Sequence, residues 1–235
     1  MILIENFEVT GFEHAIRGMR NPMNSWDKSD SYLQCREYDK LSDDKNKTYL
    51  IDEYSVGSND HELMMKLVNG GPVHAKFRRM ITVYVDITAP LYWWKEFDTY
   101  KVGTVANSCS TMHKIHDKRF EMSDFSTDHL LPASFKCLGF TVKTLNECRD
   151  LYLGYDGFKS KYGEHDNKDY WWQMIQLLPS SYNQKRTIML NYEVLAGIYP
   201  MRKNHKMDEW HDFCRWIEGL PYSEIIVDKK ENNDG

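Results

Sequence analysis

Two stretches of the chain show the hydrophobic pattern of β-strands. Residues 1–11 alternate apolar and polar side chains, which predicts a strand. Residues 80–88 (Met-Ile-Thr-Val-Tyr-Val-Asp-Ile-Thr) are rich in β-branched and aromatic side chains, and they give the clearest strand signal in the sequence. Residues 12–48 carry glycine, proline and many charges, so we expect a helix start followed by an exposed loop.

Apolar residues at three- and four-residue steps predict the helices. Asn59 and Glu62 have the spacing of a capping box ahead of such a run, and Gly70-Gly71-Pro72 ends it. A proline at residue 90 precedes a short aromatic helix, whereas residues 101–135 are polar and irregular. Helical periodicity then continues over residues 91–100, 142–153, 166–178, 184–199 and 207–218.

This order of elements predicts an α/β protein of the α+β kind. A strand, a loop, a helix–strand–helix unit and a helical C-terminal half fit a central mixed or antiparallel sheet with helices packed on it. We expect one domain over residues 1–227, with a loop-rich insertion at 12–48 and a frayed tail at 228–235.

Charge and cysteine usage narrow the possible functions. The formal net charge of −5 argues against a broad grip on extended nucleic acid, but a single nucleotide needs only a few local donors. The five cysteines form no C-x-x-C pair, which favours a reducing compartment over a disulfide framework. No leading basic and apolar segment and no apolar run of about 20 residues is present, so we expect a cytoplasmic protein outside the membrane.

Several common catalytic motifs are absent. The sequence has no G-x-G-x-x-G and no P-loop, so neither a Rossmann fingerprint nor a phosphate-cradling loop of that kind is present. It also lacks H-E-x-x-H and G-x-S-x-G. The commonest nucleotide-binding and hydrolase classes are therefore excluded on motif grounds.

A histidine pair leaves a metal-site alternative open. His113, His116 and Asp117 lie within one helical turn and could present ligands on one side. A site needs further ligands, and none is marked, so a polar surface is the favoured reading and we expect no metal. A metal-dependent hydrolase built on these three residues is the weaker alternative. His205 and His211 are expected to be surface or capping residues rather than ligands.

A run of small polar residues surrounds Cys109. Residues 107–111 (Asn-Ser-Cys-Ser-Thr) could cradle a phosphate through hydroxyls and backbone N–H groups, or form an ordinary loop. Cys109 as a nucleophile would need a base, for which His113 is the nearest candidate in sequence.

Two aromatic triplets, Tyr92-Trp93-Trp94 and Tyr170-Trp171-Trp172, are strong hydrophobic anchors. Neighbouring residues on a helix point about 100° apart, so a triplet cannot lie on one face. We expect at least one ring of each triplet to meet a second subunit or a ligand, and the others to lie in the core.

Residues in two separate stretches share an order with one known family. From residue 59 to about 112, a helix is followed by Gly71-Pro72-Val73-His74, the strand 80–88 and a helix. From residue 178 to about 216, a Leu-Pro pair is followed by Asn191 and, eleven residues later, by Arg202. In both stretches the chain resembles the flavin-dependent thymidylate synthases. The resemblance covers somewhat under half of the chain.

The signature of that family is eroded here. Its Arg-His-Arg-x-x-Ser segment should fall near residues 98–113, where this chain has Asp98-Thr99-Tyr100-Lys101 and later Ser108-Cys109-Ser110. Glu193 stands where the family usually has another arginine. Each lost charge-assisted hydrogen bond weakens a phosphate site by about 1.5–3 kcal/mol.

The resemblance implies specific roles for the residues that remain. Arg202 would hold a pyrimidine deoxynucleotide, with Ser108, Ser110 and Lys101 at its phosphate. His74, Asn191 and His205 would contact FAD. In the active members of the family, NADPH and a folate complete a reductive methylation of deoxyuridylate, and the protein is a homotetramer.

Two functions therefore follow from the sequence. The first is a flavoprotein of the thymidylate synthase-like kind, which methylates deoxyuridylate or carries out a related modification. The second is a catalytically inactive descendant that binds a nucleotide or a protein partner. The missing arginines favour the second, and the Asn191–Arg202 spacing favours the first.

Overall fold

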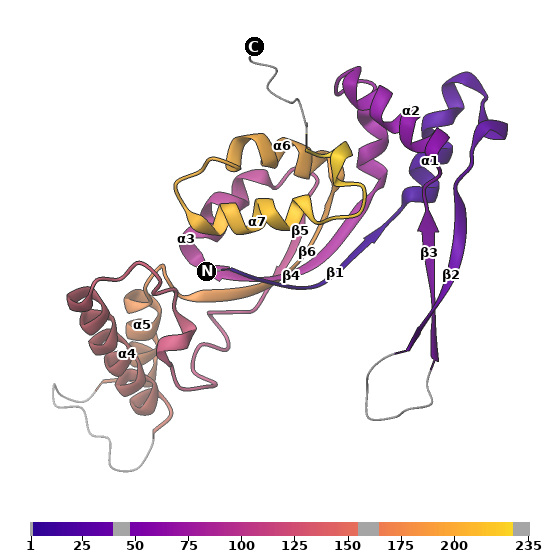
Figure 1. The fold of residues 1–235 in the computed structure, drawn as a ribbon. Helices are drawn as coiled ribbons and strands as arrows, with labels where there is room; N and C mark the ends of the chain where they lie inside the picture. The colour runs from indigo at the N-terminus through magenta and orange to yellow at the C-terminus, as the bar shows by residue number, and fades with distance from the viewer. Residues whose placement is uncertain (1, 40–47, 155–164, 228–235) are drawn as a thin grey trace. The chain divides into compact units, whose positions relative to one another are not determined.

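A computed structural model describes residues 2–39, 48–154 and 165–227 of the chain (Figure 1). The strands are β1 (Leu3–Thr10), β2 (Tyr32–Asp39), β3 (Thr48–Ser55), β4 (Thr82–Pro90), β5 (Val105–Ser108) and β6 (Asn183–Asn191). The α-helices are α1 (Phe12–Arg20), α2 (Ser58–Asn69), α3 (Leu91–Phe97), α4 (Pro132–Tyr152), α5 (Asn167–Leu177), α6 (Tyr192–Arg202) and α7 (Asp208–Glu218). Short 3-10 helices include η3 (Ala75–Met80), η4 (Asp98–Tyr100) and η6 (Ser223–Ile225).

The strands form a four-stranded sheet of order β1-β4-β6-β5 and a separate two-stranded sheet of β2 and β3. Strands β4 and β6 are antiparallel, because backbone hydrogen bonds join Leu91 to Tyr182 at one end and Tyr192 to Ile81 at the other. The predicted α+β class, with an antiparallel sheet and packed helices, is confirmed.

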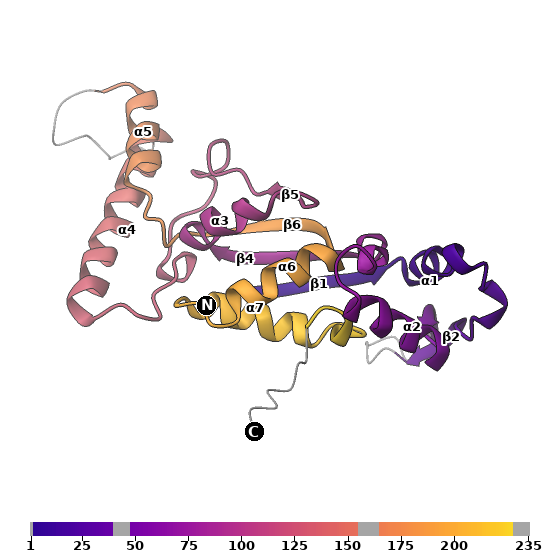
Figure 2. The ribbon, with the colours of Figure 1, turned by 90° about the horizontal axis from the view of Figure 1, so that it is seen from above.

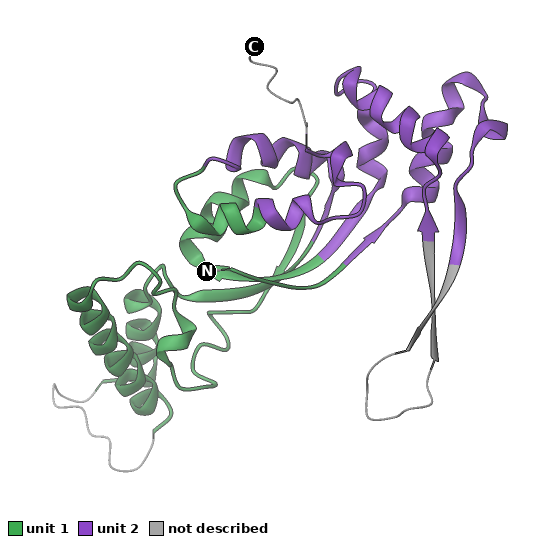
Figure 3. Ribbon diagram, in the orientation of Figure 1, with its two compact units in different colours: residues 1–7, 85–188, 205–213 green, residues 8–84, 189–204, 214–235 purple. Residues whose placement is uncertain are grey.

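The chain forms two compact units (Figure 3). Unit 1 comprises residues 1–7, 85–188 and 205–213, and unit 2 comprises residues 8–84, 189–204 and 214–235. By these ranges β1, β4 and β6 contribute residues to both units. The expectation of one domain over residues 1–227 stays a prediction, and the tail at 228–235 lies outside the described residues.

Unit 1 has two hydrophobic centres. In the first, α3 places Trp93 and Trp94 in full burial, and Trp93 packs against Trp210 of α7 with ring centroids 4.9 Å apart. The indole N–H of Trp94 donates to the Gln184 carbonyl of β6 at 2.8 Å, which fixes α3 on the sheet. The second centre lies where α4 and α5 run side by side (Figures 1 and 2), around buried Leu145 and Met174.

The aromatic triplets behave differently from each other. Trp93 and Trp94 are core residues, and the Tyr92 hydroxyl donates to Glu209 of α7. Tyr92 is only partly buried, so the expectation that one ring of this first triplet meets a subunit or a ligand stays a prediction. In the second triplet Trp172 is 41% exposed, so the expectation stays a prediction there.

Unit 2 is built around α1, α2, α6 and the segment after α7. Phe12 of α1 packs edge-on against Tyr192 of α6 and Tyr222, with ring centroids 5.8 and 5.2 Å apart. Tyr192 is fully buried and its hydroxyl donates to the Pro221 carbonyl at 2.6 Å. A large buried ring with a satisfied hydroxyl holds the C-terminal segment against α6.

Pairing between distant residues overturned one local prediction in the first fifty residues. Strand β2 pairs antiparallel with β3 from Tyr32–Ser55 to Asp39–Thr48, so the expected exposed loop is wrong for residues 32–39. The partner strand supplies the backbone hydrogen bonds that a scan of local composition cannot see. The charged run at residues 43–47 lies outside the described residues.

Two helices predicted from periodicity differ in the structure. Strand β6 occupies the first half of the predicted helix 184–199, and its inward residues Gln184, Ile188 and Leu190 follow the period of two set by pairing with β4. Helix α4 starts at Pro132, ten residues before the predicted start at 142, because proline suits a first helical turn. The helices predicted at 166–178 and 207–218 are confirmed as α5 and α7.

The predicted capping box on α2 is wrong. The helix begins at Ser58 with Gly57 as its N-cap, so Asn59 lies inside the first turn. The side chain of Asp30 supplies the cap instead, accepting the backbone N–H groups of Asn59 at 3.0 Å and Asp60 at 3.2 Å. A carboxylate from another segment thus satisfies the helix start. None of the helices within the described ranges is long and apolar enough to cross a membrane.

Candidate functional site

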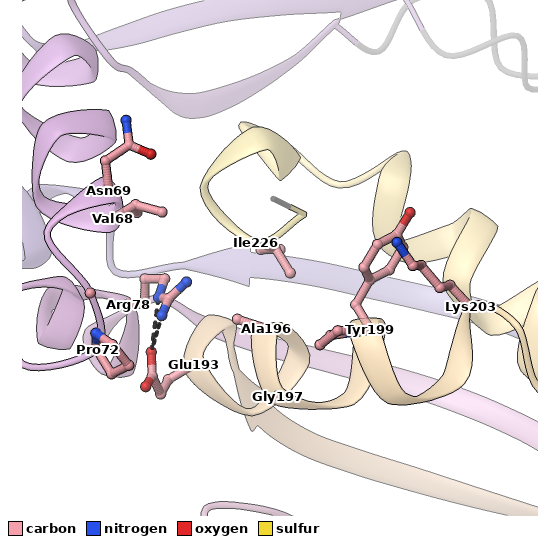
Figure 4. A pocket seen from close by; sticks show the side chains of 12 residues that line it. Val68, Asn69, Pro72, Arg78, Glu193, Ala196, Gly197, Tyr199, Lys203 and Ile226 are labelled. Carbon is pink, nitrogen blue, oxygen red and sulfur yellow. Dashed lines mark hydrogen bonds and ion pairs between the residues drawn. The ribbon is translucent and has the colours of Figure 1, made fainter. Parts of the chain in front are cut away.

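A cavity of about 450 Å³ lies within unit 2 (Figure 4). Its walls come from the end of α2, the turn before η3, one face of α6 and Ile226 after η6. All of these segments belong to unit 2. Cavities of about 300–1,000 Å³ are the usual size of small-molecule sites, so this one has room for a nucleotide-sized ligand.

Small residues on one face of α6 leave this space open. Glu193, Ala196, Gly197 and Pro200 follow each other at three- and four-residue steps, so they share a side of the helix. A Cβ atom built on Gly197 would meet no heavy atom within 4 Å. The helix therefore presents a wall without side-chain bulk at its centre, and the facing segments do not fill the gap.

An ion pair lies at one end of the cavity (Figure 4). Arg78 of η3 is 8% exposed, and both its Nε and one terminal nitrogen lie 2.8 Å from Oε2 of Glu193. The other terminal nitrogen donates to the Ile225 carbonyl at 3.2 Å. A buried guanidinium with a carboxylate partner is an oriented donor–acceptor pair rather than a free charge.

The other end of the cavity carries a tyrosine and a lysine. The Tyr199 hydroxyl donates to Glu218 at 2.6 Å, and this hydrogen bond raises the pKa of Tyr199 to about 12. Lys203 is exposed, and its ammonium lies 6.0 Å from the centre of the Tyr199 ring. The cavity thus has one paired cation at Arg78 and a second cation at its rim.

The predicted phosphate-binding residues are divided between the two units. Lys101, Ser108 and Ser110 are exposed residues of unit 1, after η4 and at the end of β5. The Ser110 hydroxyl accepts the backbone N–H of His113 at 3.0 Å. Arg202 belongs to the last turn of α6 in unit 2. Burial raises the pKa of the nearby Cys214 thiol to about 11, and the charge of Arg202 opposes this with a smaller effect. The role of these residues stays a prediction.

The three residues expected at a flavin make separate contacts and share no partner among the described residues. His74 is exposed and precedes η3, with its backbone N–H on the Gly71 carbonyl. The Asn191 side-chain oxygen caps α6 by accepting the Val194 N–H at 3.0 Å. His205 lies in unit 1, where it bonds the Met207 N–H through Nδ1.

The eroded signature segment is held by structural contacts. Asp98 accepts a hydrogen bond from Arg186 of β6 at 2.7 Å, and the Thr99 hydroxyl donates to the Glu96 carbonyl at 2.7 Å. Arg186 also stacks over the ring of Trp94 at 4.3 Å. A guanidinium does lie near this segment, but its charge is paired with a carboxylate.

The metal alternative finds no support in the described residues. Within residues 2–39, 48–154 and 165–227, no three His, Cys, Asp or Glu side chains are grouped so that they could hold a metal ion. His116 Nε2 instead lies 3.6 Å from Asp117 Oδ1, and its ring lies tilted against that of Tyr152, with centroids 4.8 Å apart. His113 makes no side-chain hydrogen bond to Cys109 in this part of the chain, so the nucleophile–base hypothesis lacks its contact.

Reasoning from sequence missed Arg78 and Gly197 as cavity residues. The signal for Gly197 was available, because small residues at helical steps mark a face that packs nothing bulky. Arg78 could not be found in this way, since its partner Glu193 lies 115 residues away. The guanidinium beside Glu193 comes from Arg78 of η3.

Comparison with known proteins gives a likeness of fold. The sequence matches no protein-family model and no curated protein. Thymidylate synthase X from Helicobacter pylori, solved with FAD and dUMP, aligns over 95% of this chain and 94% of its own at a TM-score of 0.57 and 16% identity. The UMP/dUMP methylase PolB from Streptomyces cacaoi, bound with 5-Br dUMP, aligns over 95% and 93% at a TM-score of 0.59 and 10% identity. This chain therefore has the fold of flavin-dependent thymidylate synthase-like proteins.

Proposed function

We propose that this protein binds a pyrimidine deoxynucleotide of the deoxyuridylate class. One observation carries the proposal: the similar structures were solved with dUMP or its 5-bromo derivative, and the likeness spans nearly the whole of each chain. The cavity of unit 2 supports it, because its size suits a ligand of this kind.

The enzymatic form of the proposal is reductive methylation, or a related modification, of deoxyuridylate. It would use FAD, with NADPH and a folate, as the resemblance implies. The described contacts fit a flavin poorly, because the Asn191 oxygen is used as a helix cap and His205 bonds Met207. We therefore derive no step through the flavin.

Two measurements test these parts separately. Isothermal titration calorimetry with dUMP should show saturable binding, and Arg202→Ala should weaken it at least tenfold. An unchanged affinity would remove Arg202 from the nucleotide site. An absorbance spectrum after incubation with FAD and desalting tests the cofactor, since a retained flavin absorbs in the visible region.

A specific observation favours the second candidate, a binding protein without catalysis. Both arginines of the signature triplet are missing, and the segment in their place is tied down by the Asp98–Arg186 ion pair. If the purified protein binds dUMP and retains no FAD, this candidate stands. Retained FAD that oxidises NADPH in the presence of dUMP would contradict it.

Two further expectations belong to the same proposal. We propose a homotetramer in the cytoplasm, following the family resemblance and the absence of a C-x-x-C pair from the sequence. Light scattering coupled to size-exclusion chromatography gives the mass directly, and four copies of the 27.9 kDa chain correspond to about 112 kDa (4 × 27.9). A monomer at micromolar concentration would contradict the tetramer.

A further inference from the structure

At one end of the cavity of unit 2, the paired side chains of Arg78 and Glu193 form an edge that can make further hydrogen bonds. Glu193 receives both contacts from Arg78 on the same oxygen, Oε2, and among the described residues Oε1 has no hydrogen-bond partner. Of the five N–H groups of Arg78, three are engaged by Glu193 and Ile225. The pair therefore offers a carboxylate acceptor beside two remaining guanidinium donors.

Such an edge complements a ring that has an N–H next to a carbonyl. The imide edge of uracil presents this pattern, with N3–H between two carbonyl oxygens. Glu193 would accept the N–H and Arg78 would donate to the neighbouring oxygen, so that both groups gain a hydrogen bond. Because the pair stays neutral overall, a neutral base suits it better than a charged group.

Apolar groups line the cavity next to this edge. Gly197 contributes no side chain, and Pro72, Ala196 and Ile226 add aliphatic surface (Figure 4). A planar ring buries its faces against such walls, whereas a branched aliphatic ligand would leave the polar edge unpaired.

The rim opposite the edge suits an anion. Lys203 is ten residues after Glu193, about 15 Å along the axis of α6. Its flexible four-carbon stem reaches back by about 6 Å, because helical side chains lean toward the N-terminus. The remaining span matches the length from a base through a sugar to its 5′-phosphate, and no carboxylate pairs with Lys203 among the described residues.

We propose that the cavity of unit 2 holds the nucleotide itself, with the pyrimidine edge on Glu193 and Arg78 and the 5′-phosphate at Lys203. This inference rests on the proposed function, and it places the ligand differently from the site expected at Arg202, Lys101, Ser108 and Ser110. Arg202 does not line the cavity, so this placement, unlike the expected site, predicts little effect of Arg202→Ala on dUMP binding. It also gives the Glu193 carboxylate a role in base recognition.

Filling the cavity tests the placement with a matched control. Gly197→Leu puts a side chain into the space, while Gly139→Leu makes the same change on helix α4 of unit 1, where a Cβ also meets no atom within 4 Å. With dUMP as the probe in calorimetry, we expect Gly197→Leu to lose at least tenfold in affinity. Gly139→Leu should bind as the wild type does, and both variants should melt cooperatively.

Two further comparisons test the ends of the ligand. Lys203→Met should weaken the binding of dUMP at least fivefold and leave the binding of deoxyuridine unchanged. Lys206→Met, a change at another exposed lysine, is the control. The 3-methyl derivative of dUMP lacks the ring N–H and should bind at least tenfold more weakly than dUMP to the wild type.

The outcomes separate this inference from the proposed function. Equal dUMP binding by the wild type and Gly197→Leu, with weakened binding by Lys101→Ala or Ser108→Ala, would overturn the placement and leave the function standing. Loss of FAD but not of dUMP in Gly197→Leu would also overturn it. A wild-type protein that binds no dUMP would remove both.

Discussion

The buried Asp60–Arg20 pair allows a prediction of stability that the structure makes quantitative. Asp60 of α2 is fully buried, Arg20 of α1 is 4% exposed, and Arg20 Nε lies 2.5 Å from Asp60 Oδ1. The second carboxylate oxygen accepts the hydroxyls of Ser29 at 2.7 Å and Ser31 at 2.6 Å, along with two backbone N–H groups. One carboxylate thus joins α1, α2 and the segment between them.

Replacing Asp60 with asparagine keeps the shape and removes the charge. Arg20 would then be a buried cation without a carboxylate, which costs about 3–5 kcal/mol of folding free energy. For a chain of this length we expect a fall in Tm of roughly 10 °C. Asp117→Asn is the control, because Asp117 is half exposed and pairs with exposed Lys114, a contact worth under about 1 kcal/mol.

The assay is urea denaturation at pH 7, followed by circular dichroism, with thermal melting alongside. A loss of under about 1 kcal/mol in Asp60→Asn, or a loss equal to that of Asp117→Asn, would refute the reasoning. It would mean that water or a rearrangement satisfies Arg20 once the carboxylate is gone.

The same carboxylate predicts a dependence on pH. Burial raises the pKa of Asp60, but hydrogen bonds from Ser31, Ser29 and Arg20 outweigh burial and lower it. A lowered carboxyl pKa adds stability that is present above about pH 4 and is lost as the pH falls through the folded-state pKa. Asp60→Asn should lose stability less steeply in acid than the wild type.

Three further predictions concern the core, a tyrosine and two glycines. Trp93→Ala should destabilise the protein by about 3–5 kcal/mol in urea denaturation, because it empties the centre of the aromatic cluster. Tyr199 has its pKa raised to about 12, so the stability from its bond to Glu218 is full below pH 10 and declines between pH 10 and 12. Tyr199→Phe should remove that decline, and an unchanged alkaline profile would contradict the assignment. Gly197→Ala should stabilise by up to about 1 kcal/mol, since the site is helical and open. Gly11→Ala should destabilise, because Gly11 has φ +95° and a Cβ there would overlap a backbone carbonyl; equal Tm shifts for both variants would contradict this contrast.

Local sequence patterns sufficed for much of the fold. Strand β4 and helices α2, α3, α5 and α7 lie where periodicity and proline or glycine signals predicted them, within a few residues. The chain order of these elements also indicated the fold that the comparisons then showed. These features rest on interactions between residues close in sequence, which a window of a dozen residues contains.

Other elements depended on partners far along the chain. The segment before Asn191 carries a helical spacing of apolar residues, yet it is a strand because β4 offers a ladder of hydrogen bonds to it. In the same way β2 exists through β3, and the cap of α2 comes from Asp30. Propensity is a weak preference, and a tertiary partner overrides it.

The candidate site also combines features that the sequence determined with features that only the tertiary structure decided. The sequence determined that the chain holds Asn191 and Arg202 eleven residues apart and that it lacks the signature arginines. Only the tertiary structure decided that Asn191 caps α6 and that Arg78 pairs with Glu193 beside a cavity. The physical reason is that a helix cap and a buried ion pair are defined by distances in space, and a cavity is defined by the side chains that fail to fill it.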